Sequence, residues 1–163
     1  MRTLVLYDAI KKYIKDFDKD FQISQGFIDY EREFSIGIYV QDIGPKYTKY
    51  HGTKYNGQNA RLQFIVMGGS DDDTYFKTRK VCDQLEGLSD TLQNISLATS
   101  GSYYRDEHDE IQYDKTGKSS GIEVFISNSN LLNGILNVGK SPDGHPMFSI
   151  TFLMTYFIGG NTL

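Results

Sequence analysis

The stretch Leu62-Gln63-Phe64-Ile65-Val66-Met67-Gly68-Gly69-Ser70-Asp71-Asp72-Asp73 decides the fold, because it passes from a strand to a helix through a short turn. Apolar residues alternate with others over 62–66, which is the period of a strand with one buried face. Asp71, Asp72 and Asp73 are interpreted as an N-cap and first-turn acids that suit the helix dipole. A divalent-cation site is the alternative, but the spacing lacks the alternating oxygen ligands and distal Glu of a calcium loop.

The helix predicted after these acids places Tyr75, Thr78, Cys82 and Leu85 on one face, and Gly87 is positioned to end it. We expect this face to lie on the sheet. Cys82 is therefore interpreted as a buried, inert thiol and not as a nucleophile. As the single cysteine of the chain, it excludes an internal disulfide and a Cys-rich zinc site and indicates folding in a reducing cytoplasm.

Two more elements precede the deciding stretch. Apolar side chains three or four residues apart predict an amphipathic helix over 6–17. Residues 34–41 alternate apolar and other side chains and predict a strand. Residues 44–57 are rich in Gly, Tyr and Lys and lack apolar periodicity, so they are interpreted as a long exposed connection.

The second half of the chain predicts mostly strands. In chain order we expect a short strand at 95–98, a large surface loop or extended hairpin at 100–120, strand patterns at 122–126 and 135–138, and a long final strand at 148–158. Ser141-Pro142-Asp143-Gly144 suits a type I turn, with Pro second and Gly last. A terminal β-hairpin therefore closes the sequence.

Composition narrows the class of protein. A length of 163 residues, with 39% hydrophobic and 23% charged residues, predicts one globular domain over 1–163. The formal charge of −4 argues against a dominant basic surface for nucleic acid. No apolar run reaches the roughly 18 residues of a membrane span, and the N-terminus lacks the apolar run of a signal peptide. We expect a soluble α/β or α+β protein that does not bind a membrane.

The segment Gly134-Ile135-Leu136-Asn137-Val138-Gly139-Lys140-Ser141 matches the pattern of a phosphate-binding loop. That chemistry needs a helix that begins at the Lys-Ser pair, because backbone N–H groups at a helix N-terminus hold the phosphates. Pro142, Gly144 and Pro146 forbid such a helix. A nucleotide-binding enzyme related to this loop class is thus the less favoured alternative.

No other motif indicates catalysis. His51, His108 and His145 lie far apart in predicted loops or turns, without the spacing of metal ligands. A Gly-x-Ser-x-Gly nucleophile elbow is absent from the sequence. We therefore predict a protein that is not an enzyme and that uses no cofactor and no metal.

Two polar clusters suggest contact surfaces. The cluster within 46–55 mixes Tyr and Lys, as single-strand nucleic-acid binders do, but Tyr is equally typical of protein interfaces, which the net charge favours. The acidic run within 106–110 is typical of a solvated loop tip. Its alternative role is an electrostatic contact with a neighbouring subunit or a wall that repels DNA.

The order of helix, strand, loop, strand, Gly-Gly-Ser-Asp-Asp-Asp turn, helix, long loop and terminal hairpin resembles the tail terminator proteins of long-tailed bacteriophages, often labelled minor capsid proteins. Residues 37–41, 62–69, the Asp-led helix through 82–85 and the final strand after Asp143-Gly144 carry the resemblance, which covers most of the chain. It implies an α/β (α+β) fold with a mixed β-sheet flanked by helices. It also implies a hexameric ring that caps the tail tube, ends its elongation and provides the head–tail joining surface.

The resemblance further implies the partners. These are other copies of the chain, the tail tube protein and a head–tail connector or stopper protein, while DNA passes through the channel without specific binding. The protein is then expected in the tail or neck of the virion, after assembly in the bacterial host cytoplasm. Subunit contacts are expected from sheet edges and from two loops, with the candidate residues Lys46, Tyr47, Tyr50, Tyr55, Tyr103, Tyr104, Arg105, Asp106, Glu107 and Glu110. Another neck or head-completion protein is the alternative.

Overall fold

The computed structural model describes residues 2–45, 57–89, 95–119 and 122–160. Its elements, in chain order, are α1 (Arg2–Phe17), β1 (Gln22–Gln25), β2 (Ser35–Pro45), β3 (Gln58–Met67), α2 (Asp71–Glu86), the 3-10 turn η1 (Gly87–Ser89), β4 (Ile95–Ala98), β5 (Tyr103–Arg105), β6 (Ile111–Tyr113), β7 (Ile122–Lys140) and β8 (Pro146–Gly160). The α+β class and the terminal β-hairpin are confirmed.

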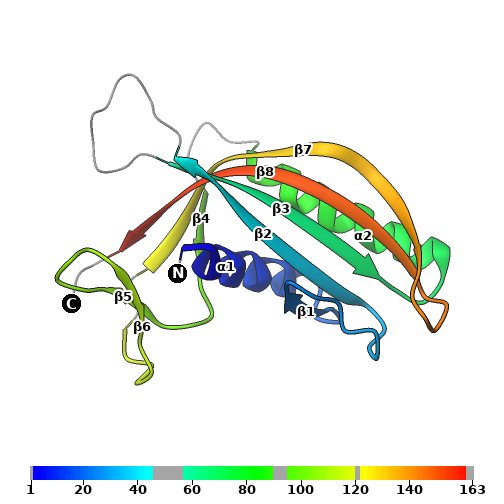
Figure 1. Ribbon diagram of the computed structural model, residues 1–163, viewed down its shortest axis with the longest axis horizontal. Helices are drawn as coiled ribbons and strands as arrows, with labels where there is room; N and C mark the ends of the chain where they lie inside the picture. The colour runs from blue at the N-terminus through cyan, green and yellow to red at the C-terminus, as the bar shows by residue number, and fades with distance from the viewer. Residues whose placement is uncertain (1, 46–56, 90–94, 120–121, 161–163) are drawn as a thin grey trace.

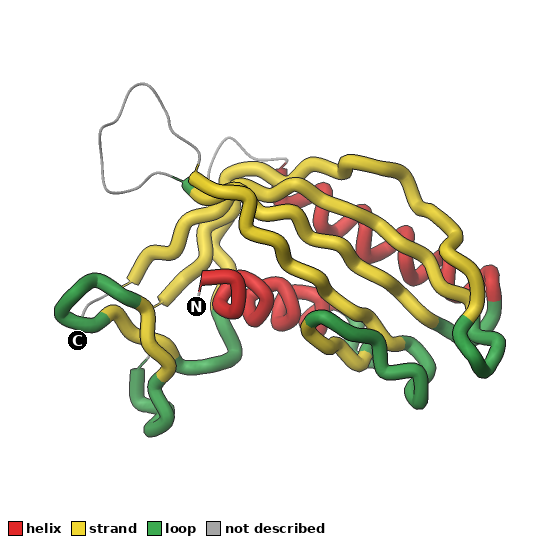
Figure 2. The backbone as a smooth tube through the Cα atoms, viewed as in Figure 1, coloured by secondary structure: helices red, strands yellow, loops and turns green. Residues whose placement is uncertain are grey.

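Six strands form one curled sheet in the order β1-β2-β3-β8-β7-β4 (Figure 1). β1 runs parallel to β2, whereas the other neighbouring pairs are antiparallel, so the sheet is mixed as expected. β5 and β6 pair only with each other among the described strands. Figure 2 shows this small hairpin below one end of the large sheet, far from the turn that joins β7 to β8.

The hydrophobic core lies between the sheet and both helices, which cover the same face. Every second residue of the central strands points into it, as period-two alternation predicts. This buried set includes Ile36, Ile38, Leu62, Phe64, Val66, Ile150, Phe152 and Met154, together with Leu6, Ile10, Ile14, Val81 and Leu85 of the helices. Because burial contributes roughly 25 cal/mol for each Å² of apolar surface, this layer is the main source of stability.

The first helix forms where the apolar spacing predicts it. α1 buries Leu6, Ile10 and Ile14, which recur every four residues along one face, together with the neighbouring Val5. It begins earlier than the predicted residue 6, at Arg2, whose guanidinium lies 3.2 Å from the Asp42 carboxylate of β2. The predicted strands at 34–41 and 62–66 are also confirmed, as β2 and β3.

The second helix corrects two details of the sequence prediction. Its N-cap is Ser70, whose hydroxyl accepts the Asp73 N–H at 3.2 Å, so the three acids form the first turn and none of them is the cap. Tyr75 was expected on the buried face but is 40% exposed. Thr74 takes the inward position, and its hydroxyl donates to the Ser70 carbonyl at 2.6 Å. The larger Tyr75 ring stays at the margin, edge-on to Phe148 at 5.9 Å.

β7 is one long strand, although its middle carries no apolar alternation. The sequence patterns at 122–126 and 135–138 are its two ends, and the Asn-rich segment between them is also paired with β8. The pairing shifts register at four places, between Ile126 and Gly139, and each shift is a β-bulge or similar irregularity. Tertiary pairing therefore keeps as strand a segment whose side chains do not predict one.

The predicted turn and the predicted hairpin are both present. The Gly144 N–H donates to the Ser141 carbonyl at 2.9 Å, which closes the turn between β7 and β8. Gly144 has φ of 84°, a left-handed conformation that glycine adopts at little cost. The short strand at 95–98 is β4, and the polar region at 100–120 contains the β5–β6 hairpin. In the described part of the chain, no helix is long and apolar enough to span a membrane.

Candidate functional site

The β5–β6 hairpin carries one of the two predicted contact loops. Tyr103 is buried there, with its ring edge-on to Tyr113 at 5.6 Å. Burial and the adjacent Asp8 carboxylate raise the pKa of Tyr103 to about 12. The Arg105 guanidinium donates to the Ile158 carbonyl of β8, and Tyr104 is half-buried. Tyr103 and Arg105 therefore attach the hairpin to the rest of the molecule.

The tip of this hairpin is organised by Asp106. Its carboxylate accepts the backbone N–H groups of His108 and Glu110, both at 2.9 Å, and the Gln112 side-chain amide at 3.1 Å. The bond from the Glu110 N–H, followed by those from Gln112 and His108, lowers the pKa of Asp106 from its ordinary value. Glu107 and Glu110 are exposed. The tip thus presents carboxylates to solvent on a turn that the Asp106 hydrogen bonds hold in place. Its role in contacts with other chains stays a prediction.

A buried carboxylate holds the start of the hairpin against the first helix. Asp8 of α1 accepts the Gly101 N–H at 2.8 Å and the Ser100 hydroxyl. Asp8 is thus a buried acid whose oxygens are engaged by groups from a segment far away in sequence. Its contacts fix where the hairpin leaves the body of the molecule.

The other predicted contact residues, Lys46, Tyr47, Tyr50 and Tyr55, lie outside the described residues, as does His51. Of the remaining histidines, His108 is exposed at the hairpin tip and His145 follows the β7–β8 turn. Among the described residues, no group of three or more His, Cys, Asp or Glu side chains is arranged to hold a metal ion.

The phosphate-loop string lies in a strand and a turn. Its Gly134 to Lys140 portion belongs to β7, and the Ser141 hydroxyl accepts the His145 N–H at 3.0 Å inside the hairpin turn. No helix begins at Lys140 and Ser141, as the prolines predicted. Cys82 is buried as predicted, and burial, with Glu86 beside it, raises its thiol pKa to about 12.

An unpaired, uncharged strand edge is the most distinctive surface of the described structure. β4 pairs with β7 only at Glu123 to Ile126, and no described strand pairs with the outer side of β7 from Ser127 to Lys140, a segment here named the β7 edge. No charged residue stands between Glu123 and Lys140. Proteins usually protect such edges with charges or Pro, so a long neutral edge is typical of a surface that another chain covers.

The β7 edge exposes large apolar side chains. Leu132, Leu136 and Val138 are 42%, 53% and 46% exposed. Leu132 and Val138 stand at register shifts, where the extra residue of the strand has no partner on β8. Leu136 pairs with Ser149, on the sheet face away from the helices. At these bulges the Leu132 and Val138 side chains are therefore exposed to solvent and not buried.

Part of the β7 edge is already satisfied within the chain. The Ser89 hydroxyl of η1 accepts the Ser129 N–H at 2.6 Å and donates to the Ser129 carbonyl. This side chain replaces a neighbouring strand at one position and leaves the segment beyond it, 130–140, without a described backbone partner on that side.

The opposite side of the same sheet has a second open segment. β1 pairs with β2 only over Ser35 to Ile38, and no described strand pairs with the outer side of β2 from Tyr39 to Pro45, here named the β2 edge. Ile43 on this edge is 45% exposed, and its neighbour Asp42 is paired with Arg2. Neither edge is predicted from the sequence, although the absence of charged residues between Glu123 and Lys140 could have indicated the β7 edge.

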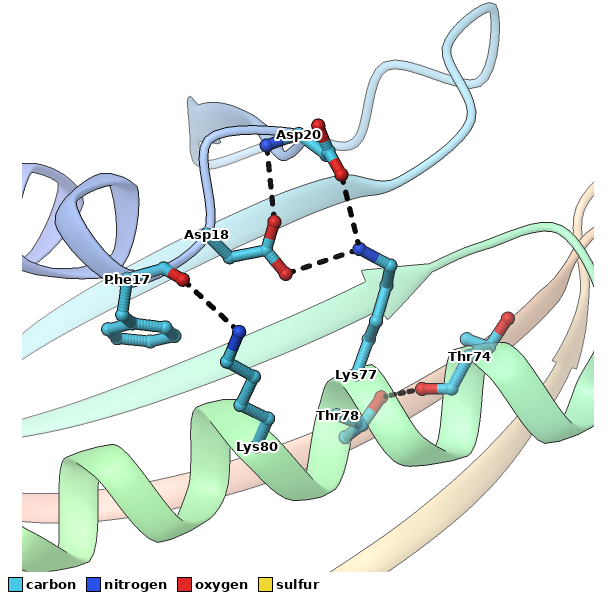
Figure 3. Close-up of polar contacts among 7 residues, drawn as sticks. All are labelled: Phe17, Asp18, Asp20, Thr74, Lys77, Thr78 and Lys80. Carbon is cyan, nitrogen blue, oxygen red and sulfur yellow. Dashed lines mark hydrogen bonds and ion pairs between the residues drawn. The ribbon is translucent and has the colours of Figure 1, made fainter.

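A polar cluster fixes α2 against the segment that follows α1 (Figure 3). The Lys77 ammonium lies 3.2 Å from Asp18 and 3.8 Å from Asp20, and it stands 4.4 Å from the centroid of the Phe34 ring. The Lys80 ammonium donates to the Phe17 carbonyl, at the end of α1, at 3.1 Å. These contacts give the Lys77 and Lys80 ammonium groups a structural role. The candidate functional surface is therefore formed by the β7 edge and the β2 edge.

No protein-family model matches this chain, and no curated protein was found to be similar to it.

Proposed function

We propose that this chain is a structural virion protein, the tail terminator of a long-tailed phage, which forms a ring on the tail tube. The observation that carries the proposal is the β7 edge, an exposed strand segment with no charged residue before Lys140, which presents Leu132, Leu136 and Val138. A protein that works by joining to other chains needs such a surface. The sequence resemblance supplies the particular assembly.

Before assembly, an isolated copy of the chain must avoid uncontrolled association. Exposed apolar edges favour uncontrolled pairing, whereas a net charge of −4 and the carboxylates of the hairpin tip repel other copies. Weak association of the free chain, strengthened on a template, follows from this balance. A terminator that joins a finished tube requires this order of events.

The acids at the β5–β6 tip suit a neck protein through which DNA passes. Exposed Glu107 and Glu110 repel phosphate groups, whereas Lys or Arg at the same place would retain them. The proposal therefore includes an acidic or neutral channel wall, with no sequence-specific contact to DNA.

Tail length is the test of this function. In the phage that encodes the chain, an amber mutation in its gene should give tails longer than the wild type and unjoined heads, and a plasmid copy should restore normal length. Electron micrographs of negatively stained lysates supply the measurement. Tails of normal length with unfilled or leaking heads would instead assign the chain to head completion, which is the neck alternative. Intact infectious particles would refute both.

The nucleotide-binding alternative has its own direct test. Calorimetry with ATP or GTP and magnesium should show no binding heat, either for the wild type or for Lys140→Ala. Saturable binding that Lys140→Ala abolishes would favour the enzyme.

A further inference from the structure

We infer that copies of this chain join head to tail, with the β7 edge of one copy, beyond Ser129, against the β2 edge, Tyr39 to Pro45, of the next. The inference deepens the proposed function and rests on it for the identity of the assembly.

The occupant of each edge follows from the topology. The two edges lie on opposite sides of one sheet, because three pairings, β2-β3, β3-β8 and β8-β7, separate them. A strand surface on one side that matches a different surface on the other side gives heterologous contacts, which extend from copy to copy and close into a ring when the rotation permits. Both halves of the joint are thus present on every copy.

Strand direction favours the same joint. Each of the three intervening pairings is antiparallel, so β7 runs opposite to β2. When the next copy has the same orientation, its β2 meets β7 as an antiparallel pair, the more stable arrangement per residue. The sheet then continues across the junction.

The blocked parts of the two edges set the register. β1 covers β2 at Ser35 to Ile38, and Ser89 occupies the backbone groups of Ser129. Among the described strands, the segments left without a neighbour are Tyr39 to Pro45 and the distal half of β7. Matching them offsets successive copies along the strand direction, and a constant offset is also what closure of tilted strands around an axis requires.

Charge and apolarity agree with this pairing. The distal half of β7 has no charge before Lys140, and on the β2 edge the only charge, Asp42, is already paired with Arg2 at 3.2 Å. Exposed Leu136 and Val138 on one side therefore meet exposed Ile43 on the other. Burial of these side chains, and not ionic attraction, stabilises the joint, so the association should strengthen or hold at high salt.

Cysteine cross-linking tests the joint. The full-length double variant Ile43→Cys/Leu136→Cys, treated with a short bis-maleimide, should give a ladder of multimers, whereas each single variant should give none. The native Cys82 does not interfere, because it is buried with a pKa raised to about 12. The matched control is Ile43→Cys/Phe76→Cys, since Phe76 is 69% exposed but lies on α2, and this pair should not form a ladder.

The possible results distinguish a failure of the inferred joint from a failure of the proposed function. Dimers from Leu136→Cys alone would show two-fold β7 pairing and overturn the inference, as would monomers from the double variant both in solution and in purified particles. If the ladder is missing while tail length still depends on the chain, the joint is wrong and the proposed function stands. If the ladder forms but tail length is normal without the chain, the proposed function fails and the joint stands.

A charge placed at the edge supplies a second measurement. In sedimentation experiments, Leu136→Lys should raise the protein concentration needed for association at least tenfold. Phe76→Lys should leave that concentration unchanged. Both side chains are exposed, so thermal melting of the two variants should match the wild type. Unchanged association of Leu136→Lys with an unchanged melt would contradict the joint.

Discussion

The Lys77 ammonium of α2 lies 3.2 Å from the Asp18 carboxylate, which is itself almost entirely buried just after α1. The pair joins elements that are far apart in the chain, and the Phe34 ring covers the ammonium at 4.4 Å. Since α1 and α2 cover the same face of the sheet, this contact fixes how the two helices stand together (Figure 3).

Removing Lys77 should therefore lower stability. Lys77→Met leaves the buried Asp18 carboxylate without its cation, and a lost bond to a buried charged group costs about 1.5–3 kcal/mol. The matched control is Lys12→Met, because Lys12 pairs with Asp16 on an exposed helix surface, where such pairs contribute about 0.3–0.5 kcal/mol. Urea denaturation of both variants measures the difference. Equal free energies of unfolding would contradict the role of Lys77.

Two buried tyrosines should respond in opposite directions to loss of the hydroxyl. The buried Tyr156 hydroxyl has no hydrogen-bond partner among the residues that the structure describes, so Tyr156→Phe should leave stability unchanged or raise it by up to about 1 kcal/mol. The Tyr103 hydroxyl lies beside the Asp8 carboxylate at Gly101, so the loss of this polar contact in Tyr103→Phe should destabilise by about 1 kcal/mol. Thermal unfolding of the pair provides the comparison, and the reverse order would refute both assignments.

The turn that follows β6 should depend on an ionised Asp114. Hydrogen bonds from the Ser119 hydroxyl, then from Thr116, hold the pKa of Asp114 well below its ordinary value of 3.8. Because the folded-state pKa is depressed, this stabilisation is present above the ordinary value and is lost as pH falls through the folded-state pKa. The Thr116 and Ser119 amide signals in an NMR titration should therefore stay constant down to pH 3.8 and move only below it. Asp114→Asn should lack that step.

Cys82 should be unreactive in the folded protein. Burial raises its thiol pKa to about 12, so the thiolate that attacks a disulfide reagent is scarce at pH 8. Ellman's reagent should label it only after unfolding in urea, at a rate set by the unfolding equilibrium. Fast labelling of the native protein would show that α2 opens locally.

Local patterns were sufficient for most elements. The apolar spacing of α1 and α2, the alternation of β2, β3 and β8, and the turn at Ser141 to Gly144 were all predicted, because periodicity and turn chemistry depend on near neighbours in the chain. The prolines after Ser141 likewise decided against a phosphate-binding helix. The resemblance to tail terminators extends this reading to function and remains a proposal.

The candidate site was much less predictable. Aromatic and charged side chains predict the contact loop at Tyr103 to Glu110, yet Tyr103 and Arg105 bind the hairpin to the rest of the molecule, and only part of the loop faces solvent. The β7 edge is not predicted, because residues 134–141 match a phosphate-loop pattern and no local pattern shows which side of a strand lacks a neighbour. Side-chain type indicates what a surface offers but not which residues form the surface.

The amino-acid sequence by itself determined the helices, the main strands and the reversal that brings β7 back along β8, since each follows from interactions between residues close in the chain. Only the tertiary structure decided that the Asn-rich middle of β7 is strand and that Tyr75 stays at the margin of the core. It also decided that, within the described part of the chain, the sheet has strand segments without a neighbour on both of its sides. The reason is that strand neighbours are chosen by contacts between distant residues, and an edge exists only once every other strand has its place.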